Sequence, residues 1–234
     1  MKTKITTGTE SFDWLLEGGY EKEVITTVYG PAGSGKTNLC LLCASAIQEK
    51  KVIYIDTEGS FSLSRFRQIT DNVEEKLEHI IIFKPTTFQE QKQAFQELKK
   101  INHANTAIII VDSIAMLYRL EMGQTKNVYE VNRQLGMQLS LLTEIARKNN
   151  IPILLTNQVY KDFEDKDKIN IVGGDLLKYQ SKCLIELQIQ PDGTRKAIIK
   201  KHRSIEENKS ILFKIVNLGF ELVEEEDEET NTSF

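Results

Sequence analysis

The residues that most constrain the fold are Gly30 to Thr37, which read Gly-Pro-Ala-Gly-Ser-Gly-Lys-Thr and match the pattern G-x-x-x-x-G-K-[ST]. This pattern is typical of a phosphate-binding loop, or P-loop, when a strand precedes it and a helix follows it. Here an apolar run at 24–30 comes directly before it, and a helical pattern at 37–50 follows. The sequence therefore predicts a P-loop at the carboxyl end of a buried strand.

Each part of the predicted loop suits one part of a nucleoside triphosphate. The glycines let backbone N–H groups turn toward phosphates, and the helix N-terminus adds its partial positive charge. Lys36 would neutralise the β- and γ-phosphate oxygens, and Thr37 would offer its hydroxyl to Mg²⁺. The sequence thus predicts ATP and Mg²⁺ as cofactors. The nucleotide-binding residues expected in this segment are Gly30, Pro31, Ala32, Gly33, Ser34, Gly35, Lys36, Thr37 and Asn38.

Apolar, β-rich runs alternate with helical patterns along the first two thirds of the chain. The predicted strands are 24–30, 52–57, 79–84, 107–112 and 152–157, and the predicted helices are 37–50, 62–70, 87–101 and 127–149. Nearly continuous apolar runs suit strands buried on both faces, and the helices are long enough to serve as parallel crossovers. We therefore expect an α/β fold with a mostly parallel central sheet flanked by helices.

The pattern changes after residue 173, where apolar runs follow one another with no room for helices between them. These runs are CLIELQIQ, TRKAIIKK and SILFKIV, with a Pro-Asp-Gly turn after the first. Short turns join antiparallel neighbours, so we expect a C-terminal antiparallel extension at one edge of the sheet. The chain is expected to form a single domain over 1–223.

The charge of the chain is unevenly distributed. Residues 224 to 229 are six consecutive acids that contribute −6, so the rest of the chain carries +2 within a net charge of −4. We expect 224–234 to be a disordered acidic tail, either a solubility tail or an interaction tail. No apolar run is long enough to span a membrane, and the first ten residues lack the apolar core of a secretory signal. We therefore expect a cytoplasmic protein with no membrane partner.

Cys40 and Cys43 form a C-x-x-C pattern within the apolar helical stretch TNLCLLCASAI. Cytoplasmic cysteines are normally reduced, and no second C-x-x-C or nearby histidine completes a zinc site. We expect buried packing for both thiols, with a functional thiol pair as the weaker alternative.

Polar residues follow three predicted strands, at the edge where an α/β sheet presents ligand-binding groups. Asp112 ends AIIIVD and is predicted to hold Mg²⁺ together with Thr37, although capping the next helix is an alternative role. Glu58 is the candidate catalytic base; Asp56 is the other available acid, and capping the helix at 62–70 is an alternative for either. Gln158 ends a later strand, where an amide can sense the γ-phosphate. Lys36, Glu58 and Gln158 are therefore the predicted catalytic residues.

The candidate site residues lie within a series of short stretches that follow one another along the chain. In order, these are ITTGTESFDWLLEGGYEKEVIT, GPAGSGKT, YIDTEGSF, IIIVDS and TNQV. This arrangement resembles the catalytic core of the RecA/RadA recombinase family over nearly the whole chain up to the acidic tail, and most closely an archaeal paralogue within that family. The resemblance implies a RecA-like P-loop ATPase core in which Glu58 is the base and Gln158 couples nucleotide state to the loop after it. It also implies adenine contacts from Arg65 and Gln68.

Two departures from the family pattern limit what the resemblance implies. The family's helical DNA-binding domain and polymerisation motif have no counterpart before the core, so we do not expect the self-assembling filament of the main recombinase; a weak homodimer stays open. Between residues 160 and 168, three lysines accompany four acids, which makes a poor phosphate-binding loop. Strand exchange is therefore not expected.

A stronger candidate for DNA contact is the basic stretch from Arg195 to Arg203, which contains no acid. Its basic residues are Arg195, Lys196, Lys200, Lys201 and Arg203. Phosphates favour such a stretch, and the resemblance links a Lys-His-Arg cluster near this place to DNA and nucleotide contacts. The alternative is an edge strand that its charges protect from aggregation.

Together these features predict an accessory protein of homologous recombination and DNA repair. It would bind ATP·Mg²⁺ and single-stranded or branched DNA, hydrolyse ATP weakly and modulate the main RadA-like recombinase. A KaiC-like signalling ATPase with protein partners is the alternative, favoured by the acidic loop at 160–170. A third reading is a binding module that uses ATP only as a structural ligand.

Overall fold

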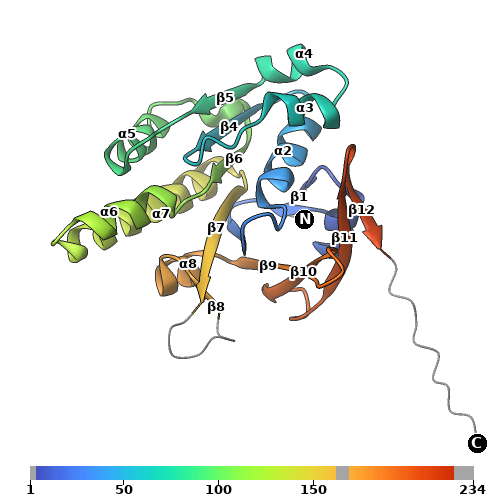
Figure 1. The fold of residues 1–234 in the computed structure, drawn as a ribbon. Coiled ribbons are helices and arrows are strands. Elements are labelled where there is room, and N and C mark those ends of the chain that lie inside the picture. The colour runs from blue at the N-terminus through green and yellow to red at the C-terminus, as the bar shows by residue number, and fades with distance from the viewer. Residues whose placement is uncertain (1–3, 162–168, 224–234) are drawn as a thin grey trace, which may run out of the picture.

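The predicted alternation of strands and helices is present in the computed structural model, which describes residues 4–161 and 169–223 (Figure 1). The strands are β1 (Lys4–Ile5), β2 (Tyr20–Glu21), β3 (Ile25–Gly30), β4 (Lys51–Asp56), β5 (Ile80–Phe83), β6 (Thr106–Asp112), β7 (Ile153–Lys161), β8 (Ile169–Ile171), β9 (Cys183–Ile189), β10 (Arg195–Lys201), β11 (Ser210–Val216) and β12 (Gly219–Val223). The helices are α1 (Glu10–Leu15), α2 (Lys36–Ala46), α3 (Leu63–Ile69), α4 (Val73–Glu78), α5 (Phe88–Leu98), α6 (Met116–Gln124), α7 (Val128–Asn149) and α8 (Gly174–Gln180), with a 3₁₀ turn η1 (His103–Asn105).

The main sheet has ten strands in the order β12-β11-β10-β9-β3-β7-β6-β4-β5, with β8 paired to β7. The six strands from β9 to β5 run parallel, and β10, β11 and β12 follow β9 as antiparallel neighbours. This is the RecA-like α/β fold with the C-terminal antiparallel extension that the sequence predicts. Helix α8 supplies the crossover before β9, which is why β9 lies parallel to β3.

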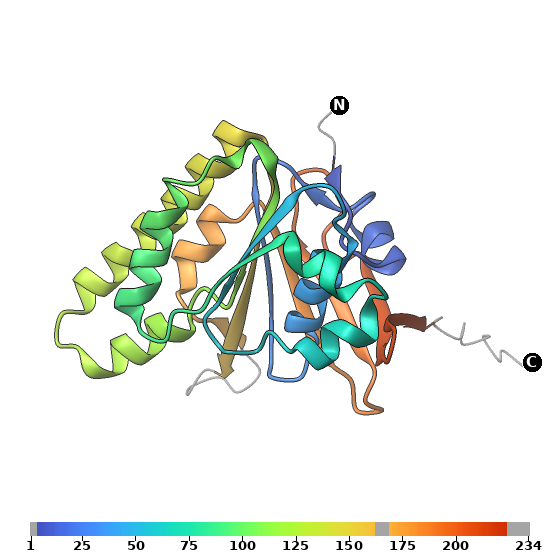
Figure 2. The ribbon, with the colours of Figure 1, turned by 90° about the horizontal axis from the view of Figure 1, so that it is seen from above.

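Helices cover both faces of the sheet (Figure 2). One core lies between the sheet and α1, α2 and α3, and the other lies between the sheet and α5, α6, α7 and α8. Every residue of β6 is buried because the strand is covered on both sides, which accounts for its nearly continuous apolar sequence. No helix among the described residues is long and apolar enough to cross a membrane.

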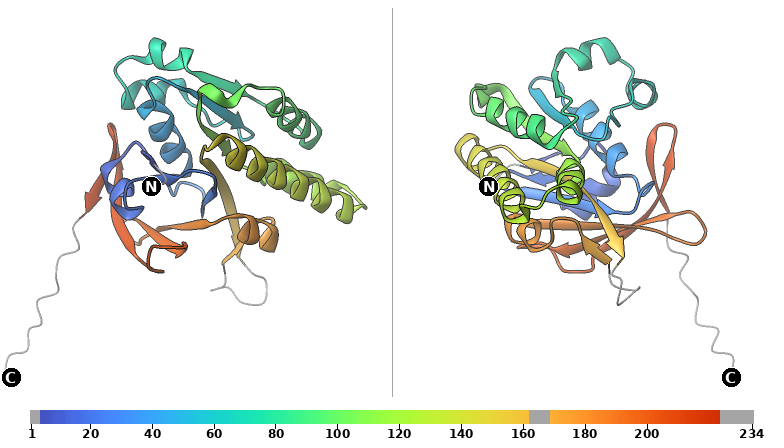
Figure 3. Two further views of the ribbon diagram at one scale, coloured as in Figure 1. Left: turned by 180° about the vertical axis from the view of Figure 1, so that it is seen from behind. Right: turned by 60° about the vertical axis from the view of Figure 1, so that its left-hand side comes forward.

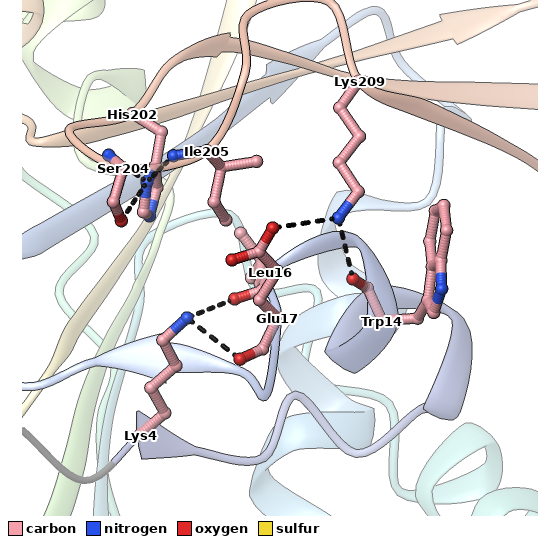
Figure 4. A network of polar contacts seen from close by, with 8 residues as sticks. All are labelled: Lys4, Trp14, Leu16, Glu17, His202, Ser204, Ile205 and Lys209. Atoms are coloured by element: carbon pink, nitrogen blue, oxygen red, sulfur yellow. Dashed lines mark hydrogen bonds and ion pairs between the residues drawn. The ribbon is translucent and has the colours of Figure 1, made fainter. Parts of the chain in front are cut away.

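Helix α1 packs beside β11 and β12 (Figure 3), and polar contacts hold this N-terminal region together and link it to the loop before β11 (Figure 4). Lys4 Nζ donates to the carbonyls of Leu16 and Glu17 at 2.6 and 3.0 Å. Lys209 Nζ donates to the Trp14 carbonyl and contacts a Glu17 carboxylate oxygen, at 3.3 and 3.4 Å. Helix α1 is therefore held against the loop before β11.

Two strands depart from expectation. Strand β7 continues to Lys161 rather than ending near 157, because it pairs beyond the core with β8. Strand β10 pairs with β9 on one side and β11 on the other, so the expected alternative that its charges protect an edge strand is wrong. Within the described part of the sheet, β5 and β12 end the main strand order, and β8 pairs with β7 alone. The predictions for 162–168 and for the acidic tail at 224–234 lie outside the described residues.

Candidate functional site

The P-loop connects β3 to α2, as the sequence predicts. Gly30 is the last residue of β3, and a Cβ atom there would lie 2.4 Å from the carbonyl oxygen of Leu187 on the neighbouring strand. Gly35 precedes the first turn of α2 with a φ of 107°, a conformation that side chains disfavour. These two glycines are therefore required by the fold of the loop itself. Ser34 lies between them with its side chain buried.

Lys36 begins α2 and folds back over the loop. Its Nζ donates to the carbonyls of Gly30 and Pro31, both at 2.8 Å. Burial lowers the pKa of Lys36 from its ordinary value, although the carboxylates of Glu58 and Asp112 favour its charged form. The ammonium is thus positioned at the loop where phosphate oxygens would compete for it.

A cavity of about 190 Å³ opens over the loop. This volume is smaller than a typical ligand pocket, so it suits the triphosphate end of a nucleotide rather than the whole molecule. The cavity is lined by Ala32, Gly33, Gly35, Lys36, Thr37, Asn38, Glu58 and Gln158. All eight are among the predicted site residues. They come from the P-loop, from α2 and from the ends of two strands, and the first and last of them are more than a hundred residues apart in the sequence.

The two predicted metal ligands are linked through a residue that the sequence analysis missed. Asp112 is buried at the end of β6 and accepts hydrogen bonds from Ser60 Oγ at 3.0 Å, Tyr54 Oη at 3.0 Å and Thr156 Oγ1 at 2.5 Å. Thr37 Oγ1 donates to Ser60 Oγ at 3.5 Å. The Ser60 hydroxyl therefore lies between the Thr37 hydroxyl and the Asp112 carboxylate. Ser60 belongs to the YIDTEGSF stretch, three residues after the 52–57 strand, but no sequence pattern indicated its role.

This donor set fits Mg²⁺, which binds oxygen ligands and usually takes only one or two protein carboxylates, with water and phosphate completing the shell. The described residues contain no group of three or more His, Cys, Asp or Glu that could hold a metal by themselves. Helix capping does not occupy Asp112, since α6 begins only at Met116.

Glu58 and Gln158 meet at the mouth of the cavity. Gln158 Nε2 donates to Glu58 Oε1 at 3.0 Å. Gln158 is the register partner of Gly30 in the β3–β7 pair, which places its side chain beside the P-loop. Glu58 does not cap α3, because Ser62 accepts the hydrogen bond from the Arg65 backbone N–H instead.

Asp56, the alternative acid, has a different role. It is buried, and its two carboxylate oxygens accept hydrogen bonds from the backbone N–H groups of Ser60 and Phe61, at 2.9 and 3.1 Å. Both oxygens are therefore engaged in shaping the loop that carries Glu58, and Asp56 does not line the cavity.

The Arg65 side chain makes four hydrogen bonds beside the cavity. Its guanidinium donates to Asn38 Oδ1 at 2.6 Å and Gln68 Oε1 at 2.9 Å, and to the carbonyls of Val216 and Asn217, both at 2.8 Å. Arg65 is connected to the cavity through Asn38, which lines it, and Gln68 lies next to Arg65. The contact with the β11–β12 turn was not apparent from the sequence.

The five basic residues at 195–203 do not form one continuous surface. Arg195 and Lys196 point to opposite faces of β10, and the pairing register shifts between Ile199 and Lys201. Arg195 Nη2 lies 3.5 Å from the carbonyl oxygen of Gly33, so this side chain belongs to the P-loop surroundings.

The remaining cations of this stretch differ in how they are engaged. Lys200 is exposed and lies 3.9 Å from Glu186, whereas Lys201 donates to the carbonyls at the end of α8, Lys178 and Ser181, at 2.7 and 2.8 Å. Arg203 forms an ion pair with Glu21 at 2.8 Å. Lys201 and Arg203 thus have structural partners within the chain.

The C-x-x-C cysteines are buried in α2, as expected for packing, and both are free. Burial raises the pKa of each thiol, so neither is activated as a thiolate.

Comparison with known proteins identifies clear relatives. A family model described as Rad51 matches residues 2–222. The protein from Methanococcus maripaludis (strain C7) named DNA repair and recombination protein RadB is 44% identical over 213 residues, which cover 89% of this chain and 96% of the relative. The protein of the same name from Thermococcus kodakarensis is 40% identical, over 94% of this chain and 100% of the relative. A solved structure described as the crystal structure of the RadB recombinase superposes with a TM-score of 0.81 at 39% identity, over 94% of this chain and all of that one.

Proposed function

Because this chain belongs to the Rad51 family, whose model matches residues 2–222, we propose that it is a RadB-like accessory protein of homologous recombination and DNA repair. It binds ATP·Mg²⁺ and DNA, hydrolyses ATP weakly and modulates the main recombinase in the cytoplasm. The relatives carry the name of a DNA repair and recombination protein, which favours this function over the KaiC-like signalling alternative.

The P-loop and its surroundings bind the nucleotide. Backbone N–H groups of the loop and Lys36 take the phosphates, and Arg65 and Gln68 lie toward the base. Thr37 and Asp112 would hold Mg²⁺, which neutralises charge on the β- and γ-phosphates. Lys36 exchanges its two intramolecular carbonyl acceptors for phosphate oxygens, which is favourable because hydrogen bonds between charged groups are stronger.

The hydrogen bond between Gln158 and Glu58 is the observation that carries the catalytic assignment. Glu58 acts as the base that accepts a proton from the attacking water. Gln158 orients Glu58 and connects it to β7, whose continuation leads to the segment at 162–168. A binding module that used ATP only for stability would have no need of a carboxylate at this point of the cavity.

The charge around the cavity supports the proposal of weak turnover. Lys36 is the only cation among the residues that line it. Phosphoryl transfer develops charge that related enzymes neutralise with a further arginine, which raises turnover by about 10³–10⁵. We therefore expect hydrolysis to be slow unless a partner or a second copy supplies that charge.

The test of catalysis compares the wild type with Glu58→Gln. The variant should bind ATP·Mg²⁺ with unchanged affinity, because the phosphates contact the P-loop, but its turnover should fall by about 10²–10⁴. Glu49→Gln, which changes an exposed acid outside the cavity, is the matched control. Equal turnover in wild type and Glu58→Gln would refute the assignment of the base.

We place the DNA surface on the face of β10 that carries Lys196 and Lys200, opposite the face on which Ala197 and Ile199 are buried. Binding should weaken as salt increases, and Lys196→Ala/Lys200→Ala should lower affinity and reduce the salt slope by about one per lost phosphate contact. Lys201→Ala is the control, because Lys201 caps α8; it should lower stability and leave the salt slope unchanged. A steep salt dependence that survives in the double variant would exclude this face.

A further inference from the structure

Arg195 is a cation without an acidic partner beside the P-loop. Its side chain is half-buried, and its Nε atom is buried with no hydrogen-bond partner. No carboxylate of the described residues lies within ion-pair distance of it, whereas Arg133 and Arg203 are paired with Glu130 and Glu21. A charged donor left in this state is costly, so its position calls for an explanation.

The alternation of side chains along β10 puts Arg195 on the P-loop face of the sheet. Ala197 and Ile199 are buried in the core that contains α2. Arg195 points to the same side, because side chains two residues apart on a strand share a face. Its register partner on β11 is Phe213, and a Cβ atom on Gly35 would lie 3.7 Å from the Phe213 ring. Arg195 therefore approaches the P-loop from the sheet.

The turn before β10 holds the guanidinium in place. Asp192 Oδ1 accepts hydrogen bonds from the Thr194 backbone N–H and hydroxyl, at 3.0 and 2.7 Å, which shapes this turn. Arg195 Nη1 donates to the Gly193 carbonyl at 2.7 Å, and Nη2 lies 3.5 Å from the Gly33 carbonyl oxygen. The contact with Gly33 is long, so Nη2 retains the capacity to interact with a stronger acceptor.

Gly33 is the part of the P-loop that this charge approaches. It lines the cavity over the loop, and a Cβ atom there would have no neighbour within 4 Å. A side chain at this position would stand between the loop and its surroundings, and the glycine leaves that space open. Attraction between partly buried charges acts over several ångströms and is only partly screened. Arg195 can therefore stabilise phosphates in the cavity without lining it.

The charges of the cavity favour a second cation nearby. Lys36 is the only cation among the lining residues, and the carboxylates of Glu58 and Asp112 lie close enough to influence it. A bound triphosphate adds more negative charge than one Mg²⁺ neutralises. The occupied site therefore carries an excess of negative charge that a neighbouring cation would offset.

From its face of the sheet, its contact with Gly33 and its missing acidic partner, we infer that Arg195 is a positioning residue for ATP, whose charge holds the triphosphate over the P-loop. It acts on nucleotide binding rather than on turnover, because it does not line the cavity that holds Glu58. The inference rests on the proposed nucleotide site and assigns Arg195 to it, in place of the DNA contact that the sequence suggested.

The test compares full-length wild type, Arg195→Gln and Arg195→Lys by isothermal titration calorimetry at two salt concentrations. Arg195→Gln should weaken ATP·Mg²⁺ binding about tenfold, as for the loss of one charged interaction. It should weaken ADP·Mg²⁺ binding less, since ADP carries less negative charge. Arg195→Lys should recover most of the loss because it keeps the charge. The difference between wild type and Arg195→Gln should narrow as salt increases.

Two controls separate this role from a general effect on charge or folding. Lys214 is exposed on β11 and faces away from the side on which Phe213 is buried, so Lys214→Gln loses the same charge elsewhere and should keep its ATP affinity. Turnover at saturating ATP should be equal in wild type and Arg195→Gln, whereas a variant that had merely unfolded would lose turnover as well.

Three outcomes would overturn the inference. The first is equal ATP affinity in wild type and Arg195→Gln. The second is a loss in Arg195→Lys as large as that in Arg195→Gln, which would make shape rather than charge responsible. The third is an unchanged ATP affinity together with a reduced salt slope of DNA binding, which would make Arg195 a DNA contact. Absence of ATP binding in the wild type would instead refute the proposed nucleotide site itself, and this inference with it.

Discussion

Ser60 links the two expected magnesium ligands, Thr37 and Asp112, by hydrogen bonds. Its hydroxyl accepts from Thr37 and donates to Asp112, so it keeps both oxygen groups oriented before any metal arrives. A serine in a loop after a strand is common, and its importance here depends on the distance between α2 and β6. That distance is a tertiary property, which explains why the sequence pointed to Thr37 and Asp112 but not to Ser60.

Replacing this serine tests its role. Ser60→Ala should raise the Mg²⁺ concentration needed for half-maximal ATP binding several-fold, because Asp112 loses one of its three orienting hydrogen bonds. The stability cost should be about 1 kcal/mol, as for one hydrogen bond. Ser64→Ala, at an exposed position of α3, is the matched control. Magnesium titration of nucleotide binding measures the effect, and an unchanged Mg²⁺ requirement would argue against Ser60 as the positioning residue.

His202 makes the stability depend on pH. Its Nδ1 accepts hydrogen bonds from the backbone N–H groups of Ser204 and Ile205, at 3.1 and 3.0 Å, which requires a neutral ring (Figure 4). Burial lowers the pKa of His202 below its ordinary value of 6.5, against the opposing influence of Glu21. The unfolded chain therefore binds this proton more readily than the folded one, so stability is full above about pH 6.5 and is lost as the pH falls toward the folded pKa.

The measurement is thermal unfolding between pH 5 and 8. His202→Asn provides the comparison, because an asparagine side chain can accept from the same backbone groups without titrating. The wild type should lose more stability than His202→Asn as the pH falls below 6.5. Parallel pH profiles for the two proteins would show that His202 is not the responsible group.

At the scale of elements, Arg65 connects parts of the chain that are distant in sequence. It joins α2, α3 and the turn between β11 and β12 by four hydrogen bonds. Arg65→Lys keeps the charge but loses the planar fork, so it should loosen the β11–β12 hairpin while leaving the rest of the sheet intact. Amide hydrogen exchange should accelerate at 219–223 and not in β6. Arg67→Lys is the matched control, and equal protection at 219–223 in wild type and Arg65→Lys would refute the connection.

The elements differ in how well the sequence predicts them. Strands such as β6 are recognisable because burial on both faces requires an uninterrupted apolar run, and the carboxyl ends of β4, β6 and β7 then locate Glu58, Asp112 and Gln158. Short elements such as α1 are not recognisable from the sequence, because α1 is stabilised by tertiary contacts. Asp13, for example, accepts hydrogen bonds from Thr6 and Thr7. The basic residues at 195–203 were predicted to form one DNA-binding surface, because the register shift before Lys201 has no clear signature in the sequence.

On the scale of the whole molecule, the sheet is continuous from β5 to β12. The strands that carry the nucleotide site, β3, β4, β6 and β7, therefore lie in the same sheet as the strands at its two ends. The core beside α1 and α2 contains residues of β3, β6 and also β9 to β11. Gly35 of the P-loop lies against the hairpin, since a Cβ atom there would be 3.4 Å from both Ile215 and Phe220. The C-terminal extension is therefore part of the same packed unit as the ATP site.

One cooperative transition should follow from this continuity. Trp14 fluorescence reports the end of the molecule near β12, and far-ultraviolet circular dichroism is dominated by the helices, of which α7 is the longest. The two melting curves should coincide. ATP·Mg²⁺ at about a hundred times its Kd should add about 2.7 kcal/mol, which raises both midpoints together by roughly 5–10 °C for a chain of this size. Lys36→Ala should keep the single transition and lose the shift, because it lacks the phosphate contact. If ATP moved only the circular dichroism curve, the extension would be an independent unit and 1–223 would not be one domain.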